Sequence, residues 1–401
     1  MSGLSYVDLF AGAGGLSVGL ERAGFNLVHA VEVNEDARAT FAHNRDKWSP
    51  EDLSGNIRDY QTEAEILEEV GQGSVDLVVG GPPCQGFSEV ISPDGSDERN
   101  HLFEDFMNWV RVLRPQAALF ENVRGIQSTA GGKFLDAVKQ SFDNFGYDVT
   151  PRVIESSDFG VPQHRHRLLV LATKQEQTQS PFDKYEIEPK AVPGVIDAIG
   201  DLPELGSGEV SKEYRCPPQT VIQSDLRGNS ESLTSHQAAN HSKKLIERIS
   251  HVPDGGSKDD IPEHLQPSSG YHNSYSRLKS DEPAVAITSN MSKPSSARCV
   301  HPFQDRGLTP REGARLQTFP DHYEFLGTLG AIRKQIGNAV PPYLAEAVGY
   351  YLREAVFGRD LTAADKERIY RLRCGGMSPE EFGEQRPYLR THAQQQTLDQ
   401  I

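Results

Sequence analysis

Regular alternation of two patterns over the first 175 residues constrains the fold more than any other feature. Short runs rich in β-branched and aliphatic residues are predicted strands: Ser5–Phe10, Leu27–Glu32, Val75–Gly80, Ala117–Glu121 and Leu168–Ala172. Longer stretches between most of them have helical character: Gly15–Ala23, Glu63–Val70, Leu102–Leu113 and Gly132–Phe145. Such alternation is typical of an α/β fold, a Rossmann-like, mostly parallel sheet with helices on both faces.

The composition changes near residue 175. From Lys174 to Gln304, Pro, Ser, Gly and His are frequent, and the main helical stretch is His241–Val252. Apolar clusters such as Ala284–Ile287 persist, so we expect a small loop-rich domain there and not a disordered linker. Helices are expected again at Thr309–Gln317 and Pro342–Ala355. The predicted divisions are 1–179 and 306–358 for the α/β domain, 180–305 for the loop-rich domain, and 359–401 for a helical extension.

The four cysteines, at positions 84, 216, 299 and 374, are far apart and form no CxxC pair. This pattern argues against a disulfide framework and a zinc site, so we expect a reducing cytoplasm and no metal. No apolar run approaches the roughly 18 residues of a membrane span, and the first ten residues do not resemble a secretory signal.

The net charge of −16 argues against a generally basic nucleic-acid-binding surface. Between His264 and Pro320, however, seven Lys and Arg stand against four Asp and Glu. That excess favours a local contact with a polyanion, although chance scatter explains it equally well. The acidic remainder is compatible with an ordinary acidic surface or with adaptation to high salt, in which distant charges are screened.

A glycine-rich turn, Asp8-Leu-Phe-Ala-Gly-Ala-Gly-Gly-Leu16, follows the first strand and opens a helix. Such a turn lets a ligand approach the backbone and the helix N-terminus. The next strand ends in Glu32, the type of residue that accepts hydrogen bonds from ribose hydroxyls. The glycines alone also fit a structural turn, but together with Glu32 they favour a cofactor that contains a nucleoside.

Four further motifs lie at the ends or starts of predicted strands and helices. In Gly80-Gly-Pro-Pro-Cys-Gln-Gly-Phe-Ser88, the prolines stiffen the backbone that presents Cys84, a candidate nucleophile. Glu121, in Phe-Glu-Asn-Val, is a candidate general acid held by Asn122, or alternatively a helix-capping acid. In Gln163-His-Arg-His-Arg167, alternation places Gln163, Arg165 and Arg167 on one face of a strand. The last motif, Gln335–Pro342, is interpreted as a turn that enters the final large helix.

These motifs, in this order and spacing, resemble those of the DNA (cytosine-5)-methyltransferase family. The matching blocks are Asp8–Gly15, Glu32, Gly80–Ser88, Glu121–Val123, Gln163–Arg167, Leu308–Pro320 and Gln335–Pro342. They span the chain to about residue 355, and the stretch from about 180 to 305 falls where the family keeps its variable target-recognition region.

The resemblance implies base flipping and a covalent mechanism on double-stranded DNA. Cys84 would add to cytosine C6, Glu121 would hydrogen-bond or protonate N3, and Arg165 would contact O2. The activated C5 would then take a methyl group from S-adenosylmethionine, and loss of the C5 proton would expel Cys84. Gln163, Arg167 and Ser88 would contact DNA. A restriction endonuclease for the same site is a possible partner, and the protein is expected to be a monomer.

For the cofactor, the resemblance places Phe10 against the adenine and Gly12, Gly14, Gly15 and Leu16 around the methionine end. Glu32 would hold the ribose, Asn56, Ile57 and Pro83 would line the adenine pocket, and Asn338 would close it. Position 56 is Asn where the family usually has Asp. An amide oxygen still accepts a hydrogen bond from the adenine amino group, so we expect reduced selectivity at most.

Two alternatives remain at this point. A tRNA (cytosine-5)-methyltransferase uses the same scaffold, but we would expect a shorter recognition region than the more than 100 residues here. A non-catalytic DNA-binding relative is expected to have lost Cys84, Glu121 or Arg165, and all three are present.

Overall fold

The computed structural model describes residues 3–71, 73–83, 102–174, 192–268 and 272–373. The chain forms two compact units. The first comprises residues 1–155, 166–187 and 345–366, and the second comprises 156–165, 188–344 and 367–401. The chain thus returns to the first unit at residue 345, and not at 306 as the motif order suggested, because residues 306–344 pack with the loop-rich segment.

The first unit contains a six-stranded sheet with the order β2-β1-β3-β4-β7-β5. Its strands are β1 (Leu4–Leu9), β2 (Phe25–Val31), β3 (Leu77–Gly80), β4 (Ala117–Val123), β5 (Asp148–Glu155) and β7 (His166–Thr173). The pairs β1–β2, β1–β3 and β3–β4 are parallel, whereas β7 is antiparallel to both β4 and β5. The predicted α/β fold and mostly parallel sheet are therefore confirmed, with β5 as an additional edge strand.

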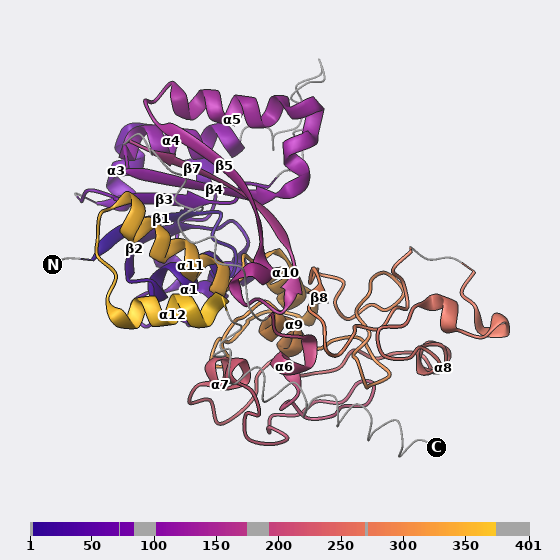
Figure 1. Cartoon of the computed structure of the whole chain (residues 1–401). Helices are drawn as coiled ribbons and strands as arrows, with labels where there is room; N and C mark the ends of the chain where they lie inside the picture. The colour runs from indigo at the N-terminus through magenta and orange to yellow at the C-terminus, as the bar shows by residue number, and fades with distance from the viewer. Residues whose placement is uncertain (1–2, 72, 84–101, 175–191, 269–271, 374–401) are drawn as a thin grey trace. The chain divides into compact units, whose positions relative to one another are not determined.

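Helices cover both faces of this sheet (Figure 1). The helices of the first unit are α1 (Gly15–Arg22), α2 (Glu35–His43), α3 (Glu63–Val70), α4 (Leu102–Leu113) and α5 (Lys133–Asp143). Short turns are η1 (Pro50–Asp52), η2 (Ile57–Asp59) and η4 (Arg124–Gly132). After α11 (Pro342–Tyr351), the π-helical turn η9 (Leu352–Val356) ends the predicted last large helix, and α12 (Ala363–Arg373) is the described part of the extension.

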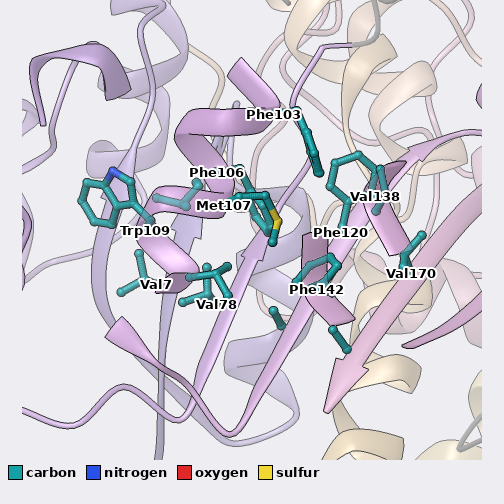
Figure 2. Close-up of a cluster of buried hydrophobic side chains, with 14 of the residues drawn as sticks. Val7, Val78, Phe103, Phe106, Met107, Trp109, Phe120, Val138, Phe142 and Val170 are labelled. Atoms are coloured by element: carbon teal, nitrogen blue, oxygen red, sulfur yellow. The ribbon is translucent and has the colours of Figure 1, made fainter. Parts of the chain in front are cut away.

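One large apolar core fixes the sheet against α3, α4 and α5 (Figure 2). Trp109 and Phe106 on α4 are fully buried, and Phe120 on β4 packs edge-on against Phe106 at a ring distance of 5.8 Å. Because β1, β3 and β4 are also covered on the opposite face, nearly all their residues are buried. This explains the continuous apolar runs in the sequence.

The second unit is built from short elements joined by loops. Its helices are α6 (Val195–Ile199), α7 (Val221–Arg227), α8 (Lys243–Ser250), α9 (Pro310–Leu316) and α10 (Leu329–Asn338). Short turns are η5 (Ser156–Phe159), η7 (Lys258–Asp260) and η8 (Glu263–Leu265), and β6 (Gln163–His164) pairs with β8 (Ala284–Val285) in parallel. The motif Gln335–Pro342 is thus the last turn of α10 and a three-residue connection, and not a turn alone.

Buried ion pairs add to the apolar contacts that hold the second unit together. Arg306 donates two hydrogen bonds to Glu312, of 2.8 and 2.6 Å, and Arg315 pairs with both Asp201 and Asp321. These arginines and carboxylates are all fully buried or nearly so. The Arg306 guanidinium holds the pKa of Glu312 well below its usual value. Removing one partner of such a pair leaves an uncompensated buried charge, so these pairs are expected to be structural.

Two arginines counted in the expected basic face, Arg306 and Arg315, are therefore internal. Arg277 and Arg311 are buried as well, where their guanidinium groups donate to backbone carbonyl groups. The interpretation of this whole stretch as a basic surface is thus wrong, because composition does not distinguish a buried cation from an exposed one. No helix in the described parts of the chain has the length and apolar character to cross a membrane.

Asp8, within the buried strand β1, accepts a hydrogen bond of 2.5 Å from the Ser17 hydroxyl of α1. Burial raises the pKa of Asp8 from 3.8 to about 7. The folded state therefore retains a proton that the unfolded state releases over this pH range. The free energy of unfolding should consequently fall as pH rises from about 4 to about 7, by at most about 1.4 kcal/mol per pH unit from this group.

We predict that Asp8→Asn removes this pH dependence, because the amide is neutral throughout and still accepts the Ser17 hydrogen bond. Urea unfolding of wild type and variant at several pH values between about 4 and about 7 tests this. The variant should gain stability relative to wild type as pH rises. A constant difference in free energy across the range would show that Asp8 does not titrate there.

Candidate active site

Parallel register brings three motifs to one edge of the sheet. Leu9 of β1 is opposite Gly80 of β3, and Gly80 is opposite Phe120 of β4. The segments that follow these residues therefore leave the sheet side by side at its carboxyl edge, where α/β folds bind ligands. Cys84 and Ser88 lie outside the described residues, but Pro83, which precedes Cys84, is described and exposed.

Two glycines allow the strands to approach closely at this edge. A Cβ atom on Gly80 would lie 2.5 Å from the carbonyl oxygen of Leu9, and one on Gly81 would lie 2.6 Å from Oε2 of Glu121. Either contact is too short for a real side chain. The backbone that leads toward Cys84 thus passes directly over the carboxyl group of Glu121.

Glu121 is held by an arginine, and Asn122 has a different role from the one predicted. The Arg167 Nε atom lies 2.8 Å from Glu121 Oε1, and both side chains are largely buried. Asn122, which is buried, donates from Nδ2 to the carbonyl oxygen of Pro82 at 2.9 Å, and its Oδ1 accepts from the Val123 amide. Asn122 therefore fixes the proline segment, whereas Arg167 orients the carboxyl group.

Arg165 has a different environment from Arg167. Its side chain is buried in the second unit, and the guanidinium donates to the carbonyl oxygens of Ile287, Gly337 and Ala339 at 2.7, 2.8 and 3.0 Å. These three bonds tie separate segments of that unit together. The expectation that Arg165 contacts a substrate base is not supported by this geometry, because the group already holds backbone carbonyls.

The side-chain amide of Gln163 likewise makes its hydrogen bonds within the second unit. Its Nε2 donates to the Leu316 carbonyl oxygen at 2.6 Å and to Gln317 Oε1 at 2.8 Å, while its Oε1 accepts from the Ile287 amide at 2.9 Å. The predicted alternation itself is confirmed, because Gln163 and Arg165 are buried whereas His164 and His166 are exposed. His166 pairs with Glu155 at 2.9 Å.

The glycine-rich turn forms an open cradle after β1. Phe10, Gly12 and Gly14 have φ values of 62°, 57° and 83°, which are in the left-handed region. A Cβ atom on Gly12 would meet no atom within 4 Å, so open space lies above this backbone. Gly14 precedes α1 without a side-chain cap, and Gly15 and Leu16 form its first turn. A helix start without a side-chain cap, together with the free space at Gly12, suits an anionic ligand group.

Glu32 lies at the rim of this cradle. Its Oε2 accepts a hydrogen bond of 2.7 Å from the Gly12 amide, and its Oε1 accepts one of 2.7 Å from the Asn34 amide. Each oxygen retains a second lone pair, which suits two vicinal hydroxyl groups. Burial raises the pKa of Glu32, whereas the two backbone bonds lower it.

The remaining predicted cofactor residues have the following positions. Ile57 is buried, and Asn56 is exposed and accepts a hydrogen bond of 3.2 Å from the Arg58 amide at the start of η2. Asn338 is the exposed last residue of α10 in the second unit. Three or more His, Cys, Asp or Glu grouped as metal ligands do not occur among the described residues.

Sequence reasoning missed the pairing of Arg167 with Glu121. The structural feature that produces this pairing is the antiparallel register of β4 and β7, in which Val123 is opposite Arg167. This register places Arg167 diagonally across from Glu121, within reach of a long side chain. Because β7 was not predicted to run antiparallel to β4, the two arginines of the motif appeared equivalent.

Comparisons with known proteins identify relatives of this chain. Residues 4–354 match the family model of the C-5 cytosine-specific DNA methylases. The chain is 37% identical over 350 residues to the type II methyltransferase M1.HphI of Haemophilus parahaemolyticus, covering 86% of this chain and 85% of that protein. It is 31% identical over 407 residues to M.DdeI of Desulfomicrobium norvegicum, covering 92% and 94%.

Two solved structures of methyltransferases are also similar to this chain. A putative DNA modification methyltransferase encoded within an E. coli prophage is 26% identical, with a TM-score of 0.72, over 88% of this chain and 99% of that one. The Dnmt2 methyltransferase of S. pombe is 17% identical with a TM-score of 0.59, covering 87% and 98%, and shares the fold alone.

Proposed function

The chain belongs to the C-5 cytosine-specific DNA methylase family and is a DNA (cytosine-5)-methyltransferase, and we propose that Cys84, Glu121 and Arg167 carry out its chemistry. The observation that carries this proposal is the pairing of Glu121 with Arg167 directly beneath the Gly81–Pro83 segment. That segment precedes Cys84 in the sequence, and the Glu121 carboxyl group and the Arg167 guanidinium lie at the sheet edge from which it emerges.

Each group has a definite task. The Cys84 thiolate adds to C6 of a flipped cytosine, because C5 alone is too weak a nucleophile to accept a methyl group. Glu121 stabilises the charge that develops at N3 during this addition, through a hydrogen bond or a proton. Arg167 holds the Glu121 carboxyl group and is the arginine best placed to reach the neighbouring O2. Loss of the C5 proton after methylation then expels the thiolate.

The methyl donor that fits the cradle is S-adenosylmethionine, which supplies a sulfonium methyl group when bound. Its carboxylate suits the free backbone and uncapped helix start at Gly12–Leu16, and its ribose hydroxyls suit Glu32. Phe10, Asn56, Ile57 and Pro83 are the candidate contacts of the adenine, and Asn338 is a candidate contact from the second unit.

The second unit, which contains residues 188–305 of the predicted recognition region 180–305, is the candidate reader of a double-stranded DNA sequence. Within it, Ile287 is fixed by Gln163 and Arg165, and the Ser292 hydroxyl donates to the Leu308 carbonyl oxygen at 2.7 Å. The loop 288–298, which follows Ile287 and contains Ser292, carries the exposed Lys293 and the half-buried Arg298. Neither has an acidic partner among the residues that the structure describes, so both are available for phosphates.

The proposal includes a cognate restriction endonuclease for the same DNA site, and action as a monomer. The endonuclease is supported by the relatives M1.HphI and M.DdeI, which are named type II methyltransferases. Expression of the methyltransferase should protect host DNA from that endonuclease.

We predict that Cys84→Ser abolishes turnover while leaving S-adenosylmethionine binding unchanged, because a hydroxyl is a much weaker nucleophile than a thiolate at neutral pH. Methyl transfer to duplex DNA and calorimetric cofactor binding test the two parts separately. Wild type should also form a covalent complex with a 5-fluorocytosine duplex, since no C5 proton is available to leave. Full activity of the serine variant would contradict the covalent mechanism.

We predict that Arg167→Ala remains folded and lowers kcat by roughly 100-fold, the scale seen when one charge-stabilising donor is removed. The matched variant is Arg165→Ala, which leaves three carbonyl partners without their donor and should lower the free energy of unfolding by at least about 3 kcal/mol. Denaturation curves and initial rates on both variants decide the assignment. Intact turnover in the Arg167 variant would return the substrate contact to Arg165.

We predict that replacing both Lys293 and Arg298 by Ala weakens DNA binding and reduces the salt dependence of its affinity. Two lost phosphate contacts should lower the slope of log K against log salt by about 2. Lys279→Ala is the matched control, because Lys279 is exposed but already paired with Glu282 at 2.5 Å. Equal slopes in the double variant and wild type would exclude this loop from the DNA interface.

A further inference from the structure

A chain of three hydrogen-bonded polar side chains, two of them buried, lies in the first unit. The Ser54 hydroxyl lies 2.7 Å from His29 Nε2 and 2.8 Å from Glu69 Oε1. The three residues come from different segments: His29 from β2, Glu69 from α3, and Ser54 from the loop between η1 and η2. His29 and Ser54 are almost fully buried, and neither belongs to the motifs that identify the family.

Hydrogen-bond chemistry orders this chain in one direction. A carboxylate only accepts hydrogen bonds, so the Ser54 hydroxyl donates to Glu69. The His29 Nε2–H group must then donate to the Ser54 oxygen, which assigns the tautomer. The His29 ring lies parallel to that of Trp109, at a centroid distance of 6.1 Å and an angle of 10°. The fully buried Trp109 therefore restricts the orientation of the His29 ring, whose Nε2–H group donates to Ser54.

The backbone of Ser54 in turn holds Glu32. The Ser54 amide donates to the Ala30 carbonyl oxygen at 3.2 Å, and the Ser54 carbonyl oxygen accepts from the Glu32 amide at 2.9 Å. Ser54 thus forms one parallel bridge with Val31, the last residue of β2. Asn56 follows Ser54 by two residues, so the same anchor sets the position of both predicted cofactor contacts.

Arg38 on α2 provides a second hydrogen bond to the backbone of Glu32. Its Nη1 donates to the Glu32 carbonyl oxygen at 3.0 Å, and a Cβ atom on Gly55 would lie 2.9 Å from that nitrogen. The absence of a side chain at Gly55 therefore lets the guanidinium lie against the loop. Glu32 is held through its amide by Ser54 and through its carbonyl group by Arg38, while its carboxylate stays at the rim.

We propose that His29, Ser54 and Glu69 are positioning residues that set the affinity for S-adenosylmethionine by fixing Glu32 and the loop at Asn56. This inference rests on the proposed function of the cradle as the cofactor site. The three side chains do not touch the cofactor; they hold the backbone that carries the contacts. Their loss should therefore weaken cofactor binding and leave the chemical step unchanged once the cofactor is saturating.

The test is Ser54→Ala, with cofactor affinity measured by calorimetry and kinetics measured on duplex DNA. Two buried hydrogen bonds are lost, so we expect Kd and KM for S-adenosylmethionine to rise about tenfold. We expect kcat at saturating cofactor and KM for DNA to stay within about twofold of wild type, and Ser54→Thr, which retains the hydroxyl, to restore most of the affinity. Unchanged cofactor affinity in Ser54→Ala, or a loss of kcat without a change in KM, would overturn the proposal.

A second variant and two controls keep the result interpretable. Glu69→Ala changes a partly exposed side chain, so it should fold and raise the cofactor Kd about fivefold. If Ser54→Ala does not fold, an unchanged Kd in Glu69→Ala overturns the proposal. Ser5→Ala removes comparable bonds, to Ser74 and Asp76, at the opposite end of β1 and should leave affinity unchanged.

Glu32→Ala separates this inference from the function on which it rests. If Glu32→Ala abolishes cofactor binding but Ser54→Ala does not weaken it, the cradle is the cofactor site and only the positioning role fails. If neither variant affects binding, the assignment of the cradle itself is wrong.

Discussion

The close parallel pairing of β1, β3 and β4 is the constraint on which the rest of the candidate active site depends. It aligns Leu9, Gly80 and Phe120 across three neighbouring strands, so three separate motifs emerge at one edge. The approach requires Gly80 and Gly81, because a side chain at either position would collide with Leu9 or Glu121. The apolar core beneath, with Phe106 and Trp109, keeps this alignment rigid. Chemistry and cofactor binding therefore share one supporting layer.

The second unit uses a different means of stabilisation. Its apolar core around α8 is small, and buried arginines such as Arg306 and Arg315 connect its loops through carboxylates and backbone carbonyls. Arg165 does the same through three carbonyl oxygens. This arrangement lets long loops keep a defined shape without regular secondary structure. It also places Arg277, Arg306, Arg311 and Arg315 in the interior, which makes the exposed Lys293 and the half-buried Arg298 informative positions.

Much of the first unit was predictable because its strands are buried on both faces and its helices are amphipathic. The bounds of α3 and α4 match the prediction, and five of the six strands were expected. β5 escaped prediction because it is a half-exposed edge strand that contains Pro151, so it lacks a continuous apolar run. α10 escaped because its glycines and polar residues read as a turn.

The motifs located the candidate site, but the roles of individual residues depended on geometry. Asn122 was expected to hold Glu121, and it binds the Pro82 carbonyl group instead. Arg165 and Arg167 are two residues apart on one face, yet one ties loops together and the other pairs with Glu121. A one-dimensional pattern places both on the same side of a strand and does not show where that strand ends. The polar chain through Ser54 has no sequence motif at all.

The most direct test of the central claim is bisulfite sequencing of DNA from a host that expresses this protein. Cytosine methylated at C5 resists conversion, so the measurement reports both the activity and the recognised sequence. We predict resistant cytosines in one sequence context, present with wild type and absent with Cys84→Ser. Full conversion of host DNA by bisulfite in the presence of folded wild-type protein, with resistant cytosines appearing in tRNA instead, would contradict the assignment.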